Sequence, residues 1–401
     1  MDPVRNPYAP GAGQRPPALA GREAELAGFA VVLERVARSR PERSMVLTGL
    51  RGVGKTVLLN AMRGAAVRRG WGTGKIEARP GQSVRRPIAA ATHLAVRELG
   101  HPRGDVVRQV LGVVKAFAQR DEDTSATRSR RPGSARWQPG IDAPAAMGRA
   151  DSGDIEIDLV ELFADLAGLA ADTGSGIALF VDEMQDLAAG DVSALCAACH
   201  EMGQQGLPLV VVGAGLPHVP AVLSGAKSYS ERLFRYARID RLDRSAADAA
   251  LRMPALEEDA DFEDAALDAM YEATGGYPYF VQAYGKVAWD IAPRSPITAD
   301  DVAMAEPVAE SELAIGFFGS RYERATPAER EYLRAMADVA TGGRSDGPVS
   351  TSAVAQILGR SPQSVSPARD ALLKKGLIYS GQRGRIAFTV PHFGRYLTRD
   401  R

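Results

Sequence analysis

Apolar residues recur with two different spacings along the first half of the chain. Within residues 20–39 they repeat with a period near 3.6, which predicts an amphipathic helix, and the pattern returns at 56–69. Residues 177–181 and 207–212 are instead continuously apolar, as expected of parallel strands buried on both faces. Helices that alternate with such strands predict an α/β fold with a parallel sheet and crossover helices.

The remaining elements of this half follow from the same patterns. A first strand is expected at 43–50, and further helices at 87–99, 105–118 and 154–171. The segment 120–149 is rich in Ser, Arg, Pro and Gly, so we predict a surface insertion there.

The second half lacks strand patterns until its end. Residues 245–320 are predicted to form a small helical lid, interrupted by Gly275-Gly-Tyr-Pro278. In residues 321–401, a capping box at Thr326-Pro-Ala-Glu329 begins the first of three helices, and two strands flanking Gly381-Gln-Arg-Gly384 follow. Helix, helix, helix and hairpin is the order of a winged helix. The predicted domains are a Pro-rich lead at 1–20, an α/β domain at 21–244, the lid and the winged helix.

Charge is balanced overall and divided unevenly. The chain has 49 basic and 49 acidic residues, but residues 245–320 carry 15 acidic against 3 basic residues and residues 321–401 carry 14 basic against 7 acidic ones. This division predicts two modules with different partners. Residues 1–19 lack the apolar core of a signal peptide, and no run of about 18 apolar residues occurs. We therefore expect a cytoplasmic protein without a membrane partner.

The only two cysteines lie in the sequence Cys196-Ala-Ala-Cys199-His200. This spacing matches a c-type haem attachment motif. Because the stretch is predicted to be a helix between two buried strands, thiols that pack as small apolar side chains are the favoured interpretation.

A complete phosphate-binding motif follows the first predicted strand and begins a helix. The pattern G-x-x-x-x-G-K-[ST] is matched by Gly49, Leu50, Arg51, Gly52, Val53, Gly54, Lys55 and Thr56. The glycines allow backbone N–H groups to surround phosphates, Lys55 supplies charge to the β and γ phosphates, and the Thr56 hydroxyl is a ligand for Mg²⁺. The sequence therefore predicts ATP and Mg²⁺ as cofactors.

Two carboxylates end the buried strand at 177–181. Asp182 and Glu183 are expected at the carboxyl edge of the sheet, beside the phosphate loop, where open α/β sheets bind ligands. Asp182 is predicted to hold Mg²⁺ through water, and Glu183 to act as the general base toward the attacking water.

With these motifs in place, the sequence resembles the AAA+ ATPases, in particular the origin-recognition and archaeal initiator ATPases and the related STAND ATPases. Besides the phosphate loop, the resemblance rests on Pro16-Pro-Ala-Leu-Ala-Gly-Arg22-Glu, Leu179-Phe-Val-Asp-Glu-Met-Gln-Asp-Leu187, Gly213-Ala-Gly-Leu-Pro217 and Gly275-Gly-Tyr277-Pro278. It implies a three-layer P-loop AAA+ domain with a lid. It also implies that the segment of Arg22 packs near adenine and that Tyr277 and Pro278 approach the base.

Two further features bear on turnover. The family usually places a polar residue at the end of the strand after the Asp-Glu strand, where this chain has Gly213-Ala-Gly215, and the lid lacks a clear sensor arginine.

The resemblance also implies that Arg232, in Tyr229-Ser-Glu-Arg-Leu-Phe234, is an arginine finger acting on a neighbouring subunit, and hence that the protein is a homo-oligomer. The alternative is that Arg232, Arg235 and Arg238 form a basic helix face or pair with nearby acidic residues.

The last helix of the predicted winged helix carries polar and basic residues that suit a DNA groove. Ser361, Gln363, Ser364 and Ser366 lie near its start, with Arg369, Lys374 and Lys375 further along and Arg383 and Arg385 in the wing. We therefore expect an ATP/ADP switch that hydrolyses ATP slowly and binds double-stranded DNA. The alternatives are an ATP-gated adaptor that regulates an effector protein, and a nucleotide-binding scaffold without turnover.

Overall fold

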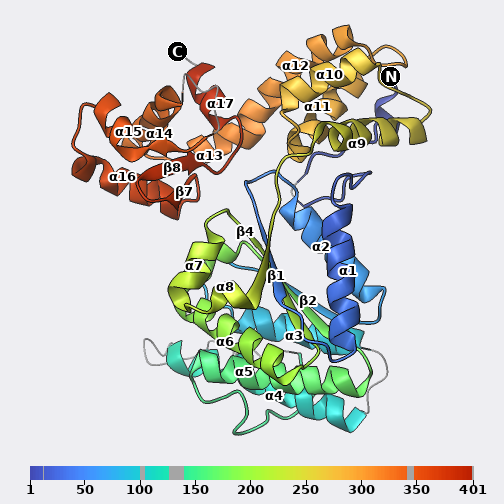
Figure 1. Ribbon diagram of the computed structural model, residues 1–401, viewed down its shortest axis with the longest axis vertical. Helices are drawn as coiled ribbons and strands as arrows, with labels where there is room; N and C mark the ends of the chain where they lie inside the picture. The colour runs from blue at the N-terminus through green and yellow to red at the C-terminus, as the bar shows by residue number, and fades with distance from the viewer. Residues whose placement is uncertain (12, 100–103, 126–139, 341–346, 400–401) are drawn as a thin grey trace.

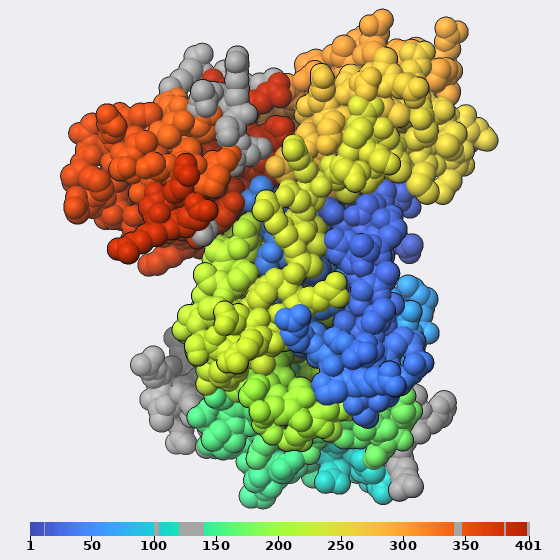
Figure 2. Space-filling view, viewed as in Figure 1, coloured from blue at the N-terminus to red at the C-terminus, as the bar shows by residue number. Residues whose placement is uncertain are grey.

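The computed structural model describes residues 1–11, 13–99, 104–125, 140–340 and 347–399, and its elements form three parts in chain order (Figure 1). An α/β domain comes first, followed by a helical lid and a C-terminal domain. Figure 2 shows the lid and the C-terminal domain side by side over the α/β domain. In the described parts of the chain, no helix is long and apolar enough to cross a bilayer.

A parallel five-stranded sheet forms the centre of the α/β domain. Its order is β2-β3-β4-β1-β5, and every neighbouring pair is parallel. The strands are β1 (Ser44–Thr48), β2 (Gly72–Glu77), β3 (Ile177–Asp182), β4 (Leu209–Gly215) and β5 (Phe234–Arg238). All residues of β1, β3 and β4 are buried, which confirms the buried parallel strands predicted from the continuous apolar runs.

Helices cover both faces of this sheet and bury two separate apolar clusters. Successive residues of β3 point to opposite faces, so that Phe180 packs with Phe29 and Leu58 in one cluster while Leu179 packs with Phe163 and Ile88 in the other. The helices that cover the first face are α1 (Glu23–Ala37) and α2 (Lys55–Val67). Those of the second are α3 (Arg85–Glu98), α4 (Gly104–Ser125), α5 (Ile155–Asp172) and α6 (Ala189–Gln205), and the short α7 (Val219–Ala226) and α8 (Ser230–Leu233) precede β5. Cys196 and Cys199 are free and buried in α6, as the packing interpretation requires.

Strand β2 was not predicted, because glycines occupy positions where a strand usually carries apolar side chains. A Cβ on Gly72 would lie 2.4 Å from the carbonyl oxygen of Ala95, and one on Gly74 would lie 2.6 Å from that of Ala91. Helix α3 therefore packs directly on the strand backbone, and glycine replaces the apolar pattern.

Two other expectations need correction. The segment 120–149 is not simply a surface insertion: α4 continues to Ser125, and Ile141 and Ala143 are buried near Lys115, whose amine donates to both of their carbonyls. Residues 126–139 of this segment lie outside the described residues. Arg235 and Arg238 lie on β5, so the proposed basic helix face does not exist.

The lid consists of four helices and a continuation toward the C-terminal domain. They are α9 (Arg244–Glu257), α10 (Asp264–Thr274), α11 (Pro278–Ile291) and α12 (Ala299–Leu313). The π-helical turn η3 (Ala314–Gly319) and α13 (Ser320–Tyr322) extend α12 without a break. A continuous helical segment therefore crosses the predicted boundary at residue 320.

In its described residues, the C-terminal domain has the predicted order of three helices and a hairpin, with a short strand and a terminal helix in addition. The order is α14 (Pro327–Val339), β6 (Val349–Ser350), α15 (Thr351–Ile357), α16 (Pro362–Lys374), β7 (Ile378–Gln382), β8 (Arg385–Phe388) and α17 (Phe393–Arg399). Strand β8 pairs antiparallel with both β6 and β7. The capping box of Thr326 and Glu329 is present, and the identification as a winged helix stays a prediction.

Residues 1–20, which we call the N-terminal strap, run from the lid to the start of α1. The strap includes the short helix η1 (Pro3–Arg5), and its Tyr8 is buried in the lid between α9 and α11. The Tyr8 hydroxyl donates to the carbonyl of Leu251, and the Asn6 amide donates to the Lys286 carbonyl at 2.9 Å. The first residues of the predicted Pro-rich lead are thus packed on the lid.

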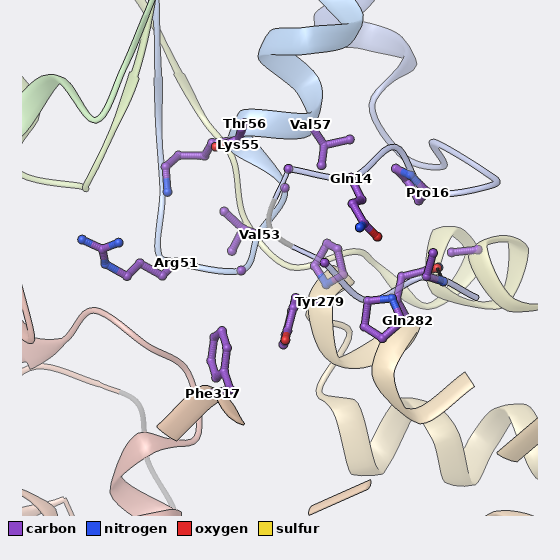
Figure 3. A pocket seen from close by; sticks show the side chains of 18 of the residues that line it. Gln14, Pro16, Arg51, Val53, Lys55, Thr56, Val57, Tyr279, Gln282 and Phe317 are labelled. Carbon is purple, nitrogen blue, oxygen red and sulfur yellow. Dashed lines mark hydrogen bonds between the residues drawn. The ribbon is translucent and has the colours of Figure 1, made fainter. Parts of the chain in front are cut away.

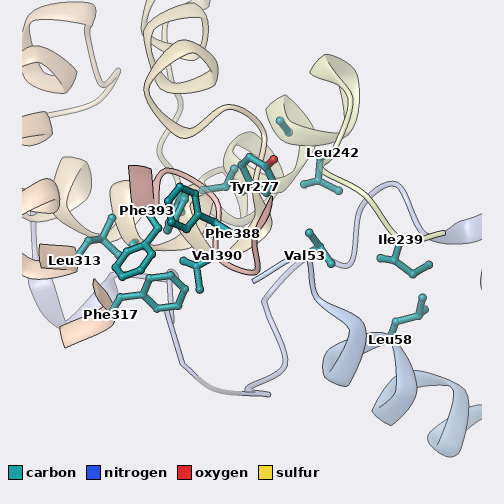
Figure 4. Packing of buried hydrophobic residues seen from close by; sticks show 14 of the residues in the cluster. Val53, Leu58, Ile239, Leu242, Tyr277, Leu313, Phe317, Phe388, Val390 and Phe393 are labelled. Atoms are coloured by element: carbon teal, nitrogen blue, oxygen red, sulfur yellow. The ribbon is translucent and has the colours of Figure 1, made fainter. Parts of the chain in front are cut away.

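One apolar cluster runs through all three parts. Figure 4 shows Val53 of the phosphate loop and Leu242 near Tyr277 of the lid, with Phe317 and Phe393 beyond. An ion pair of 3.2 Å between Arg395 of α17 and Glu310 of α12 adds to the contact between the C-terminal domain and the lid. The lid and the C-terminal domain are therefore packed against each other and on the α/β domain.

Candidate functional site

The loop between β1 and α2 has the backbone shape of a phosphate cradle. Gly52 and Gly54 have φ values of 82° and 88°, which L-residues with a side chain rarely adopt. A Cβ on Gly49 would lie 2.2 Å from the carbonyl oxygen of Ile239. The loop leads into the N-terminus of α2, whose free N–H groups and dipole favour a bound anion.

Lys55 supplies the positive charge of this cradle. Its side chain is buried, and its amine donates to the carbonyls of Gly49 at 2.9 Å and Leu50 at 2.7 Å. Burial lowers the pKa of Lys55 to about 8, and the neighbouring carboxylate of Glu183 opposes this shift. A phosphate in the cradle would favour the charged amine.

Asp182 is the last residue of β3, and Glu183 follows it at the same edge of the sheet. Asp182 is 5% exposed, and its carboxylate lies 3.6 Å from the Lys75 amine. Glu183 has a φ of 53°, a strained conformation for a residue with a side chain. Its carboxylate is paired with the Arg51 guanidinium at 3.3 Å and accepts a hydrogen bond from the Gln185 amide.

A cavity of about 690 Å³ opens over the phosphate loop, within the size range of nucleotide and other small-molecule sites (Figure 3). Gln14 and Pro16 of the strap lie on one side of it, and Tyr279 stacks on Phe317, with ring centres 4.5 Å apart, on another. Most of the cavity wall comes from the strap with Arg22, the loop and α2 from Arg51 to Val57, the start of α11, and the lid–C-terminal link with Phe317, Ser320, Arg321 and Arg324. Glu183, Leu242 and Ala250 complete it.

Two family comparisons cover most of the chain. Residues 18–212 match the family described as the AAA ATPase domain, and residues 315–397 match a domain of unknown function, DUF8462. No curated protein matches the chain significantly.

Solved structures are similar to this chain over nearly its whole length. The Walker-type ATPase PABY2304 of Pyrococcus abyssi is 15% identical, with a TM-score of 0.58 over 96% of this chain and 97% of that chain. The RuvB Holliday junction branch migration motor of Thermotoga maritima is 18% identical over 94% of this chain and 96% of that chain, with a TM-score of 0.44. The ORC1 protein of Aeropyrum pernix, in complex with DNA, is 16% identical over 96% of this chain and 94% of that chain, with a TM-score of 0.44.

The α/β domain is an AAA+ ATPase domain. The family match over residues 18–212 contains both the complete phosphate loop and the Asp182-Glu183 pair. The fold shared with the Walker-type ATPase over nearly the whole chain agrees with this assignment.

Most of the predicted site residues of this AAA+ domain converge on the cavity. Arg22, Arg51 to Thr56, Glu183 and Pro278 line it, and Gly49 and Leu50 lie just beneath, as acceptors for Lys55. Arg22 is buried and donates to the carbonyl of Val53, so it supports the loop from below.

Tyr277 and Arg232 are not among the residues that line the cavity. The Tyr277 ring instead packs edge-on against Phe280 and His392, and its neighbour Tyr279 lines the site. Arg232 lies exposed at the end of α8. The approach of Tyr277 to the nucleotide base therefore stays a prediction.

Sequence reasoning missed two arginines of the site. Arg321 and Arg324 follow the lid helices, and the Arg321 guanidinium lies 4.2 Å from the centre of the Phe317 ring. Burial lowers the pKa of Arg321 to about 10, and the charges of Arg51 and Arg324 act in the same direction. The packing of the C-terminal domain brings these residues over the phosphate loop. Since that packing joins segments far apart in the chain, it leaves no motif in the sequence.

The donor set fits Mg²⁺ bound together with a nucleotide. Mg²⁺ in such sites keeps one or two protein oxygen ligands and takes the others from phosphates and water. Thr56 offers a hydroxyl in the cavity wall and Asp182 a buried carboxylate at the strand end. Among the described residues, no cluster of three metal-binding side chains suggests a metal held by protein alone.

Proposed function

We propose that this protein is an ATP-hydrolysing switch in which the nucleotide sets the position of the C-terminal domain, and that this domain binds duplex DNA. The observation that carries the proposal is the bonding of the phosphate loop to both other parts. The Tyr279 N–H of the lid donates to the carbonyl of Gly52 at 3.2 Å, and the Arg51 N–H donates to the Thr389 carbonyl of the C-terminal domain at 2.8 Å.

The connection between the lid and the C-terminal domain supports the same coupling. Arg321 and Arg324 sit at the end of the continuous helical segment from α12 to α13 and line the nucleotide cavity. Phosphate charge drawn toward two arginines would change the electrostatic energy of this link. Since the C-terminal domain follows directly at α14, the link would transmit a change of nucleotide to that domain.

In the proposed hydrolysis, the chain contributes binding, orientation and proton transfer. Lys55 and the N-terminus of α2 hold the phosphates, and Thr56 and Asp182 hold Mg²⁺, which supplies positive charge against the phosphate oxygens. Glu183 accepts the proton of the attacking water. In an oligomer, Arg232 of a neighbouring subunit would approach the transferred phosphoryl group.

Duplex DNA binding is proposed from the exposed face of the C-terminal domain. Ser361, Gln363 and Ser364 are exposed at the start of α16, and no described carboxylate pairs with Arg383 or Arg385 in the hairpin. Polar side chains at a helix start suit base edges, while arginines in a hairpin suit phosphates.

The adaptor alternative is favoured by three other basic residues of this domain. Lys375 pairs with Glu329 at 2.6 Å, and Arg369 pairs with Asp370 at 2.9 Å. Arg360 also pairs with a carboxylate, that of Glu331. These charges are satisfied within the domain, which reduces the positive surface left for phosphates.

Fluorescence anisotropy with duplex DNA across a salt series tests the proposal, with ADP and with a non-hydrolysable ATP analogue. We expect the double variant Arg383→Ala/Arg385→Ala to bind DNA more weakly. The slope of log affinity against log salt concentration should become shallower by about 1 for each phosphate that an arginine no longer neutralises. Arg40→Ala, an exposed arginine of the ATPase domain, is the matched control. If the wild-type protein binds no DNA with ADP and none with the ATP analogue, the adaptor alternative is favoured.

Turnover is tested separately with Glu183→Gln. We expect ATP binding to be retained and phosphate release to fall by about 100-fold or more, since general-base catalysis contributes on that order. Equal rates for Glu183→Gln and wild type would rule out Glu183 as the base and favour a nucleotide-binding scaffold.

A further inference from the structure

Strand β4 ends in Gly213-Ala-Gly215, without a polar side chain next to the Asp182-Glu183 edge. The neighbouring loop after β3 occupies the space above both glycines. A Cβ on Gly213 would lie 1.9 Å from the sulfur of Met184, and a Cβ on Gly215 would lie 2.7 Å from Oε1 of Gln185 and 2.5 Å from a methyl group of Val219. The glycines of β4 therefore leave room for side chains that come from the turn η2 (Met184–Asp186).

Gln185 uses this space to join two elements of the site. Its Oε1 accepts the N–H of Leu216, directly after β4, at 3.0 Å, and its Nε2 donates to Oε2 of Glu183. The two partners fix the orientation of the amide, because a backbone N–H requires an acceptor and a carboxylate requires a donor.

The Glu183 carboxylate is thereby held at both of its oxygens. Gln185 binds Oε2, and the Arg51 guanidinium lies 3.3 Å from Oε1. Glu183 also has a left-handed backbone conformation, and these two contacts hold the direction of its side chain.

We propose that Gln185 is a positioning residue for ATP hydrolysis, which supplies from the β3 loop the polar group that β4 lacks and holds Glu183 toward the attacking water. The inference rests on the proposed function, in which Glu183 is the general base. It assigns a reason to both glycines of β4: a larger residue at either position would displace the side chains that fill the site.

The test compares Gln185→Leu, which keeps nearly the same volume without polar atoms, with Gln185→Glu and wild type. Gln185→Glu keeps an acceptor for the Leu216 N–H and loses the donor to Glu183. We expect kcat to fall by about 10- to 100-fold in both variants, because a displaced general base loses much of its contribution. The Kd for ATP, measured with a fluorescent analogue, is expected to stay within about twofold of the wild-type value, because neither variant changes a group that binds ATP in the ground state.

A double variant distinguishes positioning from a general loss of structure. In the Glu183→Gln background, Gln185→Leu is expected to cause no further fall in kcat, because the general base that Gln185 positions is already absent. Unchanged kcat in Gln185→Leu, equal losses of kcat and ATP binding, or additive losses in the double variant would overturn the inference. If Glu183→Gln itself leaves kcat unchanged, the proposed function fails first; if only Glu183→Gln lowers kcat, this inference alone fails.

If Gln185→Leu does not fold, Gln185→Ala removes the same polar atoms with a smaller side chain. Thermal melting with and without ATP monitors folding of each variant, and the ATP-induced shift reports binding independently of turnover. A Gln185→Ala protein that binds ATP and turns over at the wild-type rate would contradict the role of Gln185.

Discussion

Tyr8 fastens the N-terminal strap to the lid, so its substitution should release the strap and weaken nucleotide binding. The side chain is 3% exposed, and its ring lies 6.4 Å from the rings of both Phe262 and Trp289. It also covers Gly285, where a Cβ would lie 3.0 Å from the Tyr8 ring. Further along the strap, Gln14 and Pro16 line the cavity.

The size of the effect follows from what each substitution removes. Tyr8→Ala removes a buried aromatic ring, which costs about 3–5 kcal/mol. Even about 3 kcal/mol would lower the docking equilibrium constant by about 100-fold. Tyr8→Phe removes only the hydrogen bond to the Leu251 carbonyl, at about 1 kcal/mol, or about fivefold. Apparent affinity scales with the docked fraction. A strap whose docking equilibrium constant lies between about 10 and about 100 therefore keeps nearly all of its affinity in Tyr8→Phe and loses about two- to tenfold in Tyr8→Ala.

Hydrogen exchange of residues 1–20 and ATP titration measure the two effects in the same variants. We expect faster exchange throughout the strap and a severalfold higher Kd for ATP in Tyr8→Ala, and neither effect in the matched control Val4→Ala, whose side chain is 92% exposed. Wild-type exchange and wild-type affinity in Tyr8→Ala would refute the reasoning. Faster exchange with unchanged affinity would show that the strap does not contribute to the nucleotide site.

Three further predictions concern charged residues of the site. Because the pKa of Lys55 is lowered to about 8 and a bound phosphate favours the charged amine, ATP binding above pH 8 should take up a proton and weaken as the pH rises. Calorimetry at pH 8.5 in buffers of different ionisation enthalpy measures this uptake, which Lys55→Met should abolish and whose absence from wild type would contradict the assignment. Arg321→Ala should weaken ATP binding by about 1.5–3 kcal/mol through loss of a charge-assisted contact, whereas Arg334→Ala, at an exposed site of α14, should not; equal affinities for both would exclude Arg321 from the nucleotide. If Arg232 acts on a neighbouring subunit, mixing Arg232→Ala with Glu183→Gln should restore part of the turnover that each lacks alone, and a mixture no more active than its parts would exclude that role.

Sequence patterns predicted the elements whose stability depends on their own residues. The buried strands β1, β3 and β4, the amphipathic helices and the capping box at Thr326 were found because burial and capping leave a periodic or local signal. Strand β2 gave no such signal, since the close approach of α3 requires Gly72 and Gly74 in place of apolar residues. The two-residue strand β6 is too short to show a period at all.

The sequence by itself determined the phosphate cradle, because the glycine φ values, the buried lysine and the strand-loop-helix order all reside in one continuous segment from β1 to α2. It also determined the carboxylate edge, because Asp182 directly follows a continuous apolar run. Only the tertiary structure decided what surrounds the cradle. The strap, Tyr279 and Arg321 come from three distant segments, and they meet over the loop because the lid and the C-terminal domain share one apolar core with the ATPase domain. Packing between segments far apart in the chain leaves no spacing in the sequence that could have predicted these contacts.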